Sequence, residues 1–336
     1  MSGTAWNSWA RKSPSEESSM LLAAHIGCDW DERKLKNCLK NKTIEELWAA
    51  MEHVSIPTNN LGFLRFSPRF DGDFFPKEID KLAAEVPKKP VLVGAHDKEM
   101  GFFAILGLRQ VIHTRSVPED KWESFGEKEA VDYIRTAVAR EEYFGKRAPE
   151  VAERIVDYYL NRERPANPSY RFFLERQTDL ESDLLFTVPA RLSADIRSSL
   201  DWPVYVYRFD HFARDIYDDR IPLNGSCHVN EQSYFTGAYG VRPHAWTERE
   251  RKVQQDLIDT LVSFVYQGRP STKDVPNWPL FSSKNGEFVR IAHPQFETRS
   301  GYFEQPAEFW KGIEREFGFD AISSLSRVRN SMKNEL

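Results

Sequence analysis

The sequence predicts an α/β fold, because strand-like and helical segments alternate along its 336 residues. Residues 90–94 form a continuous apolar run bounded by proline and glycine, as expected of a fully buried strand. Residues 203–209 alternate and are rich in β-branched and aromatic side chains, which is also typical of a strand. A long helical region separates the two, and a long helix follows the second.

Three helices and a short strand are expected before the first buried strand. The first helix has Ser15 as a candidate cap and stops at Gly27. The third carries its apolar residues on one stripe. The expected segments are helices over residues 13–27, 31–40 and 43–54 and a strand over residues 62–66.

The later part of the chain is expected to be mainly helical. The last of these helices is amphipathic and ends at Gly268 and Pro270. The expected helices cover residues 130–144, 149–162, 169–200 with interruptions, and 247–267. No repeat, linker or low-complexity tract divides the sequence, so residues 1–336 are expected to lie within a single domain.

Composition argues against two classes of partner. Lys and Arg total 46 against 51 Asp and Glu, a net charge of −5, so there is no basic excess for a nucleic-acid backbone. The apolar runs are far shorter than the ~20 residues that cross a bilayer, so no transmembrane segment is expected. With 40% hydrophobic residues, the chain can bury a large core.

The three cysteines lack the paired spacing of a zinc site. Cys28 and Cys38 leave room for one short-loop disulfide, and the alternative is two reduced thiols. Cys227 is next to His228, but neighbouring side chains diverge, so a buried, inert thiol is expected. No second histidine lies at ligand spacing from His228, so no metal is expected.

The two ends of the chain give conflicting indications of location. Residues 1–10 have neither the basic nor the apolar region of a signal peptide. The last four residues are similar to a KDEL-type retrieval signal of the endoplasmic reticulum; they are Lys333, Asn334, Glu335 and Leu336. We expect either that this match is fortuitous or that the true N-terminus lies upstream.

Two polar segments follow the predicted strands. Residues 94–103 bring an acidic cluster with Glu99 to the carboxyl end of a strand, where open α/β sheets place functional groups. The alternative for Glu99 is a solvated residue that opens the next helix. Residues 224–231 form a polar, glycine-containing turn with His228, whose alternative is a surface or hydrogen-bonded histidine.

These segments, in their order and surroundings, resemble those of the type-B carboxylesterase and cholinesterase family. The segments around Glu99 and His228 are similar to its acid loop and its histidine loop. Four further places match the family. Residues 1–9 resemble its serine-glycine strand end, and Cys28 with Cys38 resembles its short disulfide loop. Residues 71–76 resemble its DG-x-FFP segment, and Phe309 with Trp310 resembles its closing FW. The resemblance spans almost the whole chain.

The resemblance implies the C-terminal portion of an α/β-hydrolase fold, with a partial, mostly parallel sheet, flanking helices and a helical insertion. It implies that Glu99 is the triad acid and His228 the triad base, and that Glu231 lies in the polar network behind the histidine. The alternative for Glu231 is a surface carboxylate. The resemblance also implies a disulfide between Cys28 and Cys38, small-molecule carboxylic esters as substrates of the complete protein, and no cofactor.

The sequence departs from the family at the nucleophile. The serine of such a triad lies on a G-x-S-x-G elbow upstream of the acid, and no serine here has glycine both two residues before and two residues after it. The family's oxyanion-hole glycines precede the elbow and are missing too. We therefore expect the chain to be part of an esterase domain, with almost no activity alone.

Two functions follow as hypotheses: an ester hydrolase, or a non-catalytic, cholinesterase-like binding or adhesion protein. Retention of both Glu99 and His228 favours the enzyme. The C-terminal tetrapeptide favours the endoplasmic reticulum lumen or secretory pathway for the complete protein, and the cytoplasm is expected if Met1 is the true start. The oligomeric state does not follow from the sequence.

Asn41 and Asn224 each begin an N-x-[ST] sequon. Asn41 lies on a polar loop next to Cys38 and is expected to be accessible to glycosylation if the chain is lumenal. Asn224 is close to His228, where a glycan would obstruct the site, so its use is not expected.

Overall fold

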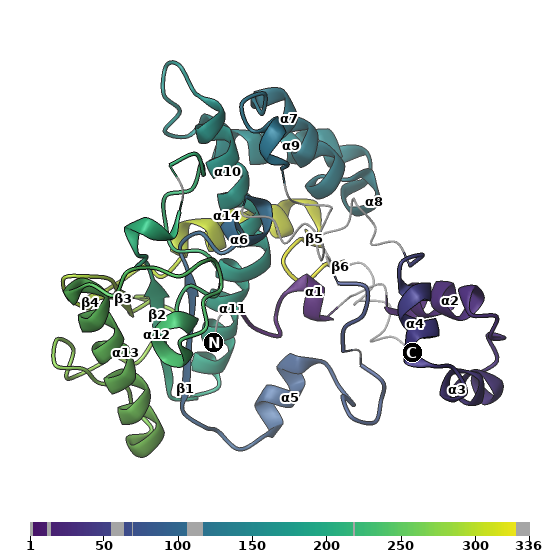
Figure 1. Ribbon diagram of the computed structural model, residues 1–336, viewed down its shortest axis with the longest axis horizontal. Helices are drawn as coiled ribbons and strands as arrows, with labels where there is room; N and C mark the ends of the chain where they lie inside the picture. The colour runs from purple at the N-terminus through teal and green to yellow at the C-terminus, as the bar shows by residue number, and fades with distance from the viewer. Residues whose placement is uncertain are drawn as a thin grey trace.

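The computed structural model of the chain describes residues 3–11, 15–54, 64–68, 70–105, 117–217 and 219–326. Its main sheet has the order β1-β2-β3-β4, with β1 (Val91–His96), β2 (Val204–Phe209), β3 (Phe288–Ile291) and β4 (Glu297–Arg299). β1, β2 and β3 are parallel, and β4 is antiparallel to β3. Figure 1 shows helices packed around this sheet, so the predicted α/β architecture is confirmed. A second, two-stranded sheet consists of β5 (Phe319–Asp320) and β6 (Leu325–Ser326).

The two predicted strands are β1 and β2, which pair side by side in the main sheet. Both are largely buried, which explains their apolar composition. Gly94 of β1 pairs with Tyr207 of β2, and a Cβ at Gly94 would lie 2.4 Å from the carbonyl oxygen of Tyr207. Glycine is therefore required at this position. β1 continues past residue 94 to His96, which places that histidine inside the sheet.

Four predicted helices are confirmed as α2, α3, α4 and α13, with bounds that differ from the prediction by a few residues. Thr43 and Glu46 form a reciprocal capping box at the start of α4. The helices before β1 are α1 (Ser8–Arg11), α2 (Ser15–His25), α3 (Glu32–Lys40), α4 (Ile44–Met51) and α5 (Ile79–Glu85). Those after β2 are the 3-10 helix η6 (Arg214–Ile216), α12 (Gln232–Thr236), α13 (Glu248–Gln267) and α14 (Glu304–Phe317). None of the helices in the described ranges is long and apolar enough to cross a membrane.

The predicted helical region between β1 and β2 is present, and its helices are interrupted. α7, α9 and α10 each run into a π-helical turn, which breaks the 3.6-residue period. The elements are α6 (Gly101–Ala104), η1 (Glu119–Lys121), α7 (Glu127–Tyr133), η2 (Ile134–Val138), α8 (Glu141–Phe144), η3 (Gly145–Arg147), α9 (Ala148–Val156), η4 (Asp157–Asn161), α10 (Tyr170–Ser182), η5 (Asp183–Thr187) and α11 (Val188–Ser199). They share one hydrophobic core with Trp310 and Ile313 of α14.

The strand predicted over residues 62–66 is wrong where it can be checked. Residues 62 and 63 lie outside the described residues, and residues 64–66 form a loop. Leu64 packs against the hydrophobic core of the helical region. Its burial therefore comes from helix packing and needs no neighbouring strand.

β3, β4 and α14 were not among the predicted elements. β3 and β4 are only three or four residues long and include charged side chains such as Arg290 and Glu297. Such strands are stabilised by their neighbours in the sheet rather than by a local pattern.

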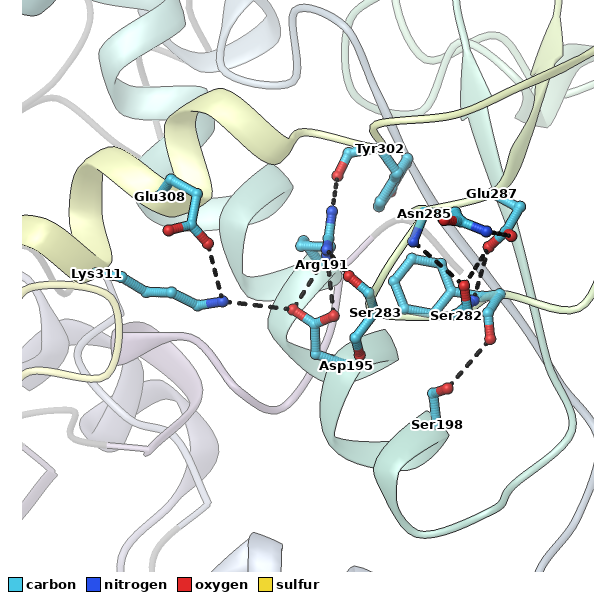
Figure 2. A network of polar contacts seen from close by, with 11 residues as sticks. Arg191, Asp195, Ser198, Ser282, Ser283, Asn285, Glu287, Tyr302, Glu308 and Lys311 are labelled. Carbon is cyan, nitrogen blue, oxygen red and sulfur yellow. Dashed lines mark hydrogen bonds and ion pairs between the residues drawn. The ribbon is translucent and has the colours of Figure 1, made fainter.

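A polar network fixes this C-terminal segment to α11, as Figure 2 shows. Arg191 of α11 is 5% exposed and donates hydrogen bonds to the carbonyl oxygens of Tyr302 (2.8 Å) and Ser283 (3.0 Å). Its Nε also contacts both carboxylate oxygens of Asp195, at 3.0 and 3.1 Å. One buried guanidinium thus connects α11 with the loops that precede β3 and α14.

The predicted disulfide between Cys28 and Cys38 is present. It connects the loop after α2 to α3, within the group of helices α2, α3 and α4 that lies at one side of the molecule in Figure 1. Asn41 follows directly as the C-cap of α3 and is exposed.

Replacing Cys28 and Cys38 together with serine is expected to lower the free energy of unfolding by about 2–3 kcal/mol, because the unfolded chain regains the entropy of an open loop. The sequence separation of the two cysteines is 10. Urea unfolding followed by circular dichroism measures the loss. The unmutated chain in reductant should lose a similar amount, and an unchanged midpoint in both samples would contradict the expectation.

Candidate active site

The two polar segments singled out in the sequence lie against each other beyond the carboxyl ends of β1 and β2. We call residues 97–100 the acid loop and residues 224–231 the histidine loop. The Lys98 amide donates to the Ser226 carbonyl oxygen (3.0 Å), and the Ser226 amide donates to Asp97 Oδ1 (2.7 Å). A Cβ at Gly225 would lie 2.5 Å from Lys98 Cγ, so the close approach of the loops requires glycine.

Glu99 and His228 are brought together by this contact between the loops. Glu99 Oε2 lies 2.7 Å from His228 Nδ1, and the His228 amide donates to the Glu99 carbonyl oxygen at 3.3 Å. The Glu99 side chain is fully buried, whereas that of His228 is 19% exposed. A buried carboxylate on Nδ1 fixes the tautomer of the imidazole and directs Nε2 away from the acid.

The surroundings keep Glu99 ionised. Burial by itself would raise the pKa of this carboxyl, but the charge of His96 and the hydrogen bond with His228 together lower the pKa well below its usual range. Glu99 therefore carries a negative charge at neutral pH and accepts hydrogen bonds from both histidines.

Three phenylalanines form an aromatic wall around the His228 ring, and the sequence had not singled them out. The ring centroids of Phe186, Phe103 and Phe102 lie 5.0, 5.4 and 6.4 Å from that of His228. Trp9, in the segment similar to the family's strand end, packs against Phe186 at 6.0 Å. Aromatic residues close to Glu99 were visible in the sequence, but those spaced along helices are more often core residues.

His96 and Glu231 complete a chain of charged groups behind Glu99. His96 Nδ1 lies 3.2 Å from Glu99 Oε1, and His96 Nε2 lies 2.8 Å from Glu231 Oε2, within ion-pair range. Glu231 is thus placed behind the acid, in contact with His96. His96 was missed as a functional candidate, although its position three residues before Glu99 was visible in the sequence.

Lys98 attaches the acid loop to α10. Its Nζ lies 2.6 Å from Asp179 Oδ1 and 2.9 Å from Glu175 Oε1. The Met100 amide also donates to the hydroxyl of Ser182 at 3.0 Å. The helical region between β1 and β2 therefore helps to position Glu99.

Cys227 is fully buried, and its thiol lies 3.4 Å from Asn230 Oδ1. Burial raises its pKa to about 12, so the thiol stays protonated at neutral pH. Across the described ranges, no cluster of three or more His, Cys, Asp or Glu side chains has the arrangement of a metal site. The C-terminal tetrapeptide, Lys333 to Leu336, lies outside the described residues.

A comparison with protein families matches residues 1–310 to the carboxylesterase family. Among curated proteins, the chain is similar over its full length to Gut esterase 1 of Caenorhabditis elegans (31% identity) and of Caenorhabditis briggsae (30%), covering 60% of each. It is also 25% identical to the Cocaine esterase of Homo sapiens over 79% of this chain and 44% of that protein. The chain thus spans about 60% of the length of the first two relatives.

Proposed function

This chain belongs to the carboxylesterase family, and from this membership we propose that Glu99 and His228 are the acid and the base of a Ser-Glu-His triad that hydrolyses carboxylic esters. The observation that carries the proposal is the 2.7 Å contact between Glu99 Oε2 and His228 Nδ1. Held in this way, His228 accepts the proton of a serine hydroxyl at Nε2 and later returns it to the leaving alcohol. The aromatic wall defined above limits the contact of the histidine with water and offers apolar surface to a substrate.

The serine and the oxyanion hole of this triad belong, in this proposal, to a further part of the esterase fold. No serine of the 336 residues lies on a G-x-S-x-G elbow. Within the described residues, β1 pairs only with β2 and so has one open edge. An apolar cavity of about 320 Å³ lies between the sheet and the helices α12 and α13, where Leu92, Phe235 and Leu261 are among its lining residues. Val265 and Tyr266 of α13 are 76% and 84% exposed. Apolar surface of this kind favours a packing partner, so residues 1–336 are part of one larger α/β-hydrolase domain.

The proposal extends to substrates and location. The substrates are small-molecule carboxylic esters, as the names of the esterase relatives suggest. The complete protein resides in the endoplasmic reticulum lumen or secretory pathway, where a disulfide between Cys28 and Cys38 is stable and the exposed Asn41 is accessible to glycosylation. Lys333, Asn334, Glu335 and Leu336 are the retrieval signal in this proposal.

A chimaera tests the function. The region of Caenorhabditis elegans Gut esterase 1 that precedes its match to this chain is fused to residue 1, and hydrolysis of 4-nitrophenyl butyrate is followed. We expect hydrolysis well above that in buffer for the chimaera and almost none for residues 1–336 alone. A folded chimaera without turnover would support a binding protein instead, and turnover by residues 1–336 alone would overturn the assignment of the serine to another part of the fold.

A further inference from the structure

His96 is a fully buried side chain at the end of β1 with a carboxylate close to each ring nitrogen. Nδ1 lies 3.2 Å from Glu99 Oε1 and Nε2 lies 2.8 Å from Glu231 Oε2. The ring packs against Phe209 of β2, with centroids 5.1 Å apart. These two carboxylates, one in the acid loop and one at the start of α12, are the charged groups that face the ring.

The two contacts favour a positive charge on His96. A neutral imidazole has one N–H and one lone pair, so one of its nitrogens would direct a lone pair at a carboxylate. The buried carboxylate of Glu99 and the partly buried carboxylate of Glu231, one on each side of the ring, would also repel each other without a cation between them. Although burial opposes a charge on His96, the carboxylates of Glu231 and Glu99 raise its pKa to about 10.

His96 also determines which oxygen of Glu99 faces His228. Oε1 of Glu99 accepts from the His96 backbone amide at 2.8 Å and contacts the His96 ring, so Oε2 is the oxygen directed at His228. Tyr302 is fully buried near Glu99, and burial raises the pKa of its phenol far above the usual range, so it adds no negative charge.

We propose that His96 is a positioning residue of the esterase site: a buried imidazolium that joins Glu231 to Glu99 and holds the Glu99 carboxylate toward His228. The proposal rests on the proposed function for its catalytic meaning, but the ion pair itself can be measured in this chain without any turnover.

The test uses residues 1–336 labelled with ¹⁵N-histidine. We expect the ¹⁵N shifts of His96 to report protonation of both nitrogens at pH about 8.5, whereas histidine ordinarily titrates near 6.5. The matched control is His211, another fully buried histidine, whose pKa is lowered to about 3 by burial and by Arg249. His211 should show the shifts of a neutral ring at the same pH. A neutral ring at His96 would overturn the proposal.

Stability gives a second, independent readout. A histidine whose pKa is raised by folding stabilises fully below about pH 6.5, and this contribution is lost as the pH rises toward its folded pKa. The free energy of unfolding should therefore fall between pH 7 and pH 10 in the unmutated chain and in His211→Asn, and fall less in His96→Gln. Equal slopes in the three proteins would overturn the charged ion pair.

The effect of His96 on the position of Glu99 is measured at the ring of His228. A proton on Nδ1 held by a carboxylate gives a far-downfield ¹H resonance, which we expect in the unmutated chain and in His211→Asn and expect to lose or shift upfield in His96→Gln. In the chimaera, His96→Gln should lower kcat by a larger factor than that by which it raises KM. An unchanged His228 resonance would refute the positioning role, whereas an inactive chimaera with the expected resonances would refute only the proposed function.

Discussion

Replacing His228 with alanine in the chimaera is expected to lower kcat/KM for 4-nitrophenyl butyrate by about 10³-fold or more. Without an imidazole, nothing accepts the proton of the serine hydroxyl, and the rate that remains comes from binding and oxyanion stabilisation. Glu99→Gln should also lower the rate steeply, because an amide on Nδ1 no longer stabilises the imidazolium that forms in the transition state. Initial rates over a range of substrate concentrations measure both effects.

The matched control is His53→Ala, since His53 is exposed just after α4 and its ring stacks on that of His25 at 4.7 Å, in the helical group that contains the disulfide. This variant should hydrolyse the ester at the unmutated rate. Circular dichroism of each variant checks that the chimaera is folded. A folded His228→Ala chimaera with full activity would refute the triad assignment.

The second large effect is expected from Arg191→Met in residues 1–336, which should lower the free energy of unfolding by about 3–5 kcal/mol. Methionine keeps the apolar volume but removes the donors that bind the carbonyl oxygens of Tyr302 and Ser283 and the carboxylate of Asp195. Buried acceptors left without donors are costly. Lys311 Nζ, 3.9 Å from Asp195 Oδ2, remains an ion-pair partner for that carboxylate, so the loss is expected mainly at the two carbonyl oxygens. Urea unfolding, with the midpoint compared at constant m-value, measures the loss.

Arg147→Met provides the control for this prediction. Arg147 also binds a carboxylate with two hydrogen bonds, to Glu150 at 2.9 Å each, but it does so on the surface. An exposed pair of this kind contributes little to stability. If the two methionine variants lost equal stability, burial of the Arg191 network would not be the cause.

The fold class and the family could be predicted from the sequence. The α/β-hydrolase class, expected from the resemblance, is confirmed by the carboxylesterase match over residues 1–310 and by the mostly parallel sheet. β1 and β2 were predictable because a strand buried on both faces has a continuous apolar or aromatic composition. β3, β4 and α14 were not, since short strands with charged residues depend on a sheet that is already present.

The candidate site, like the fold, could be predicted only in part from the sequence. Glu99 and His228 were noticed in polar segments that follow the predicted strands, but only the resemblance to the family made them candidates for acid and base. His96 was passed over because its importance depends on Glu231, a residue distant in the sequence that lies 2.8 Å away in the fold. The three phenylalanines around His228 were indistinguishable from core residues until their distances to the ring were known.

The sequence by itself determined the periodicity of the main helices and strands, the pairing of Cys28 with Cys38 through family resemblance, and the two polar loops that carry Glu99 and His228. Only the tertiary structure decided which oxygen of Glu99 faces His228 and that His96 lies between two carboxylates. The physical reason is that burial patterns are encoded locally, residue by residue, whereas the charge state and orientation of a buried group depend on partners that only chain folding brings within a few ångströms.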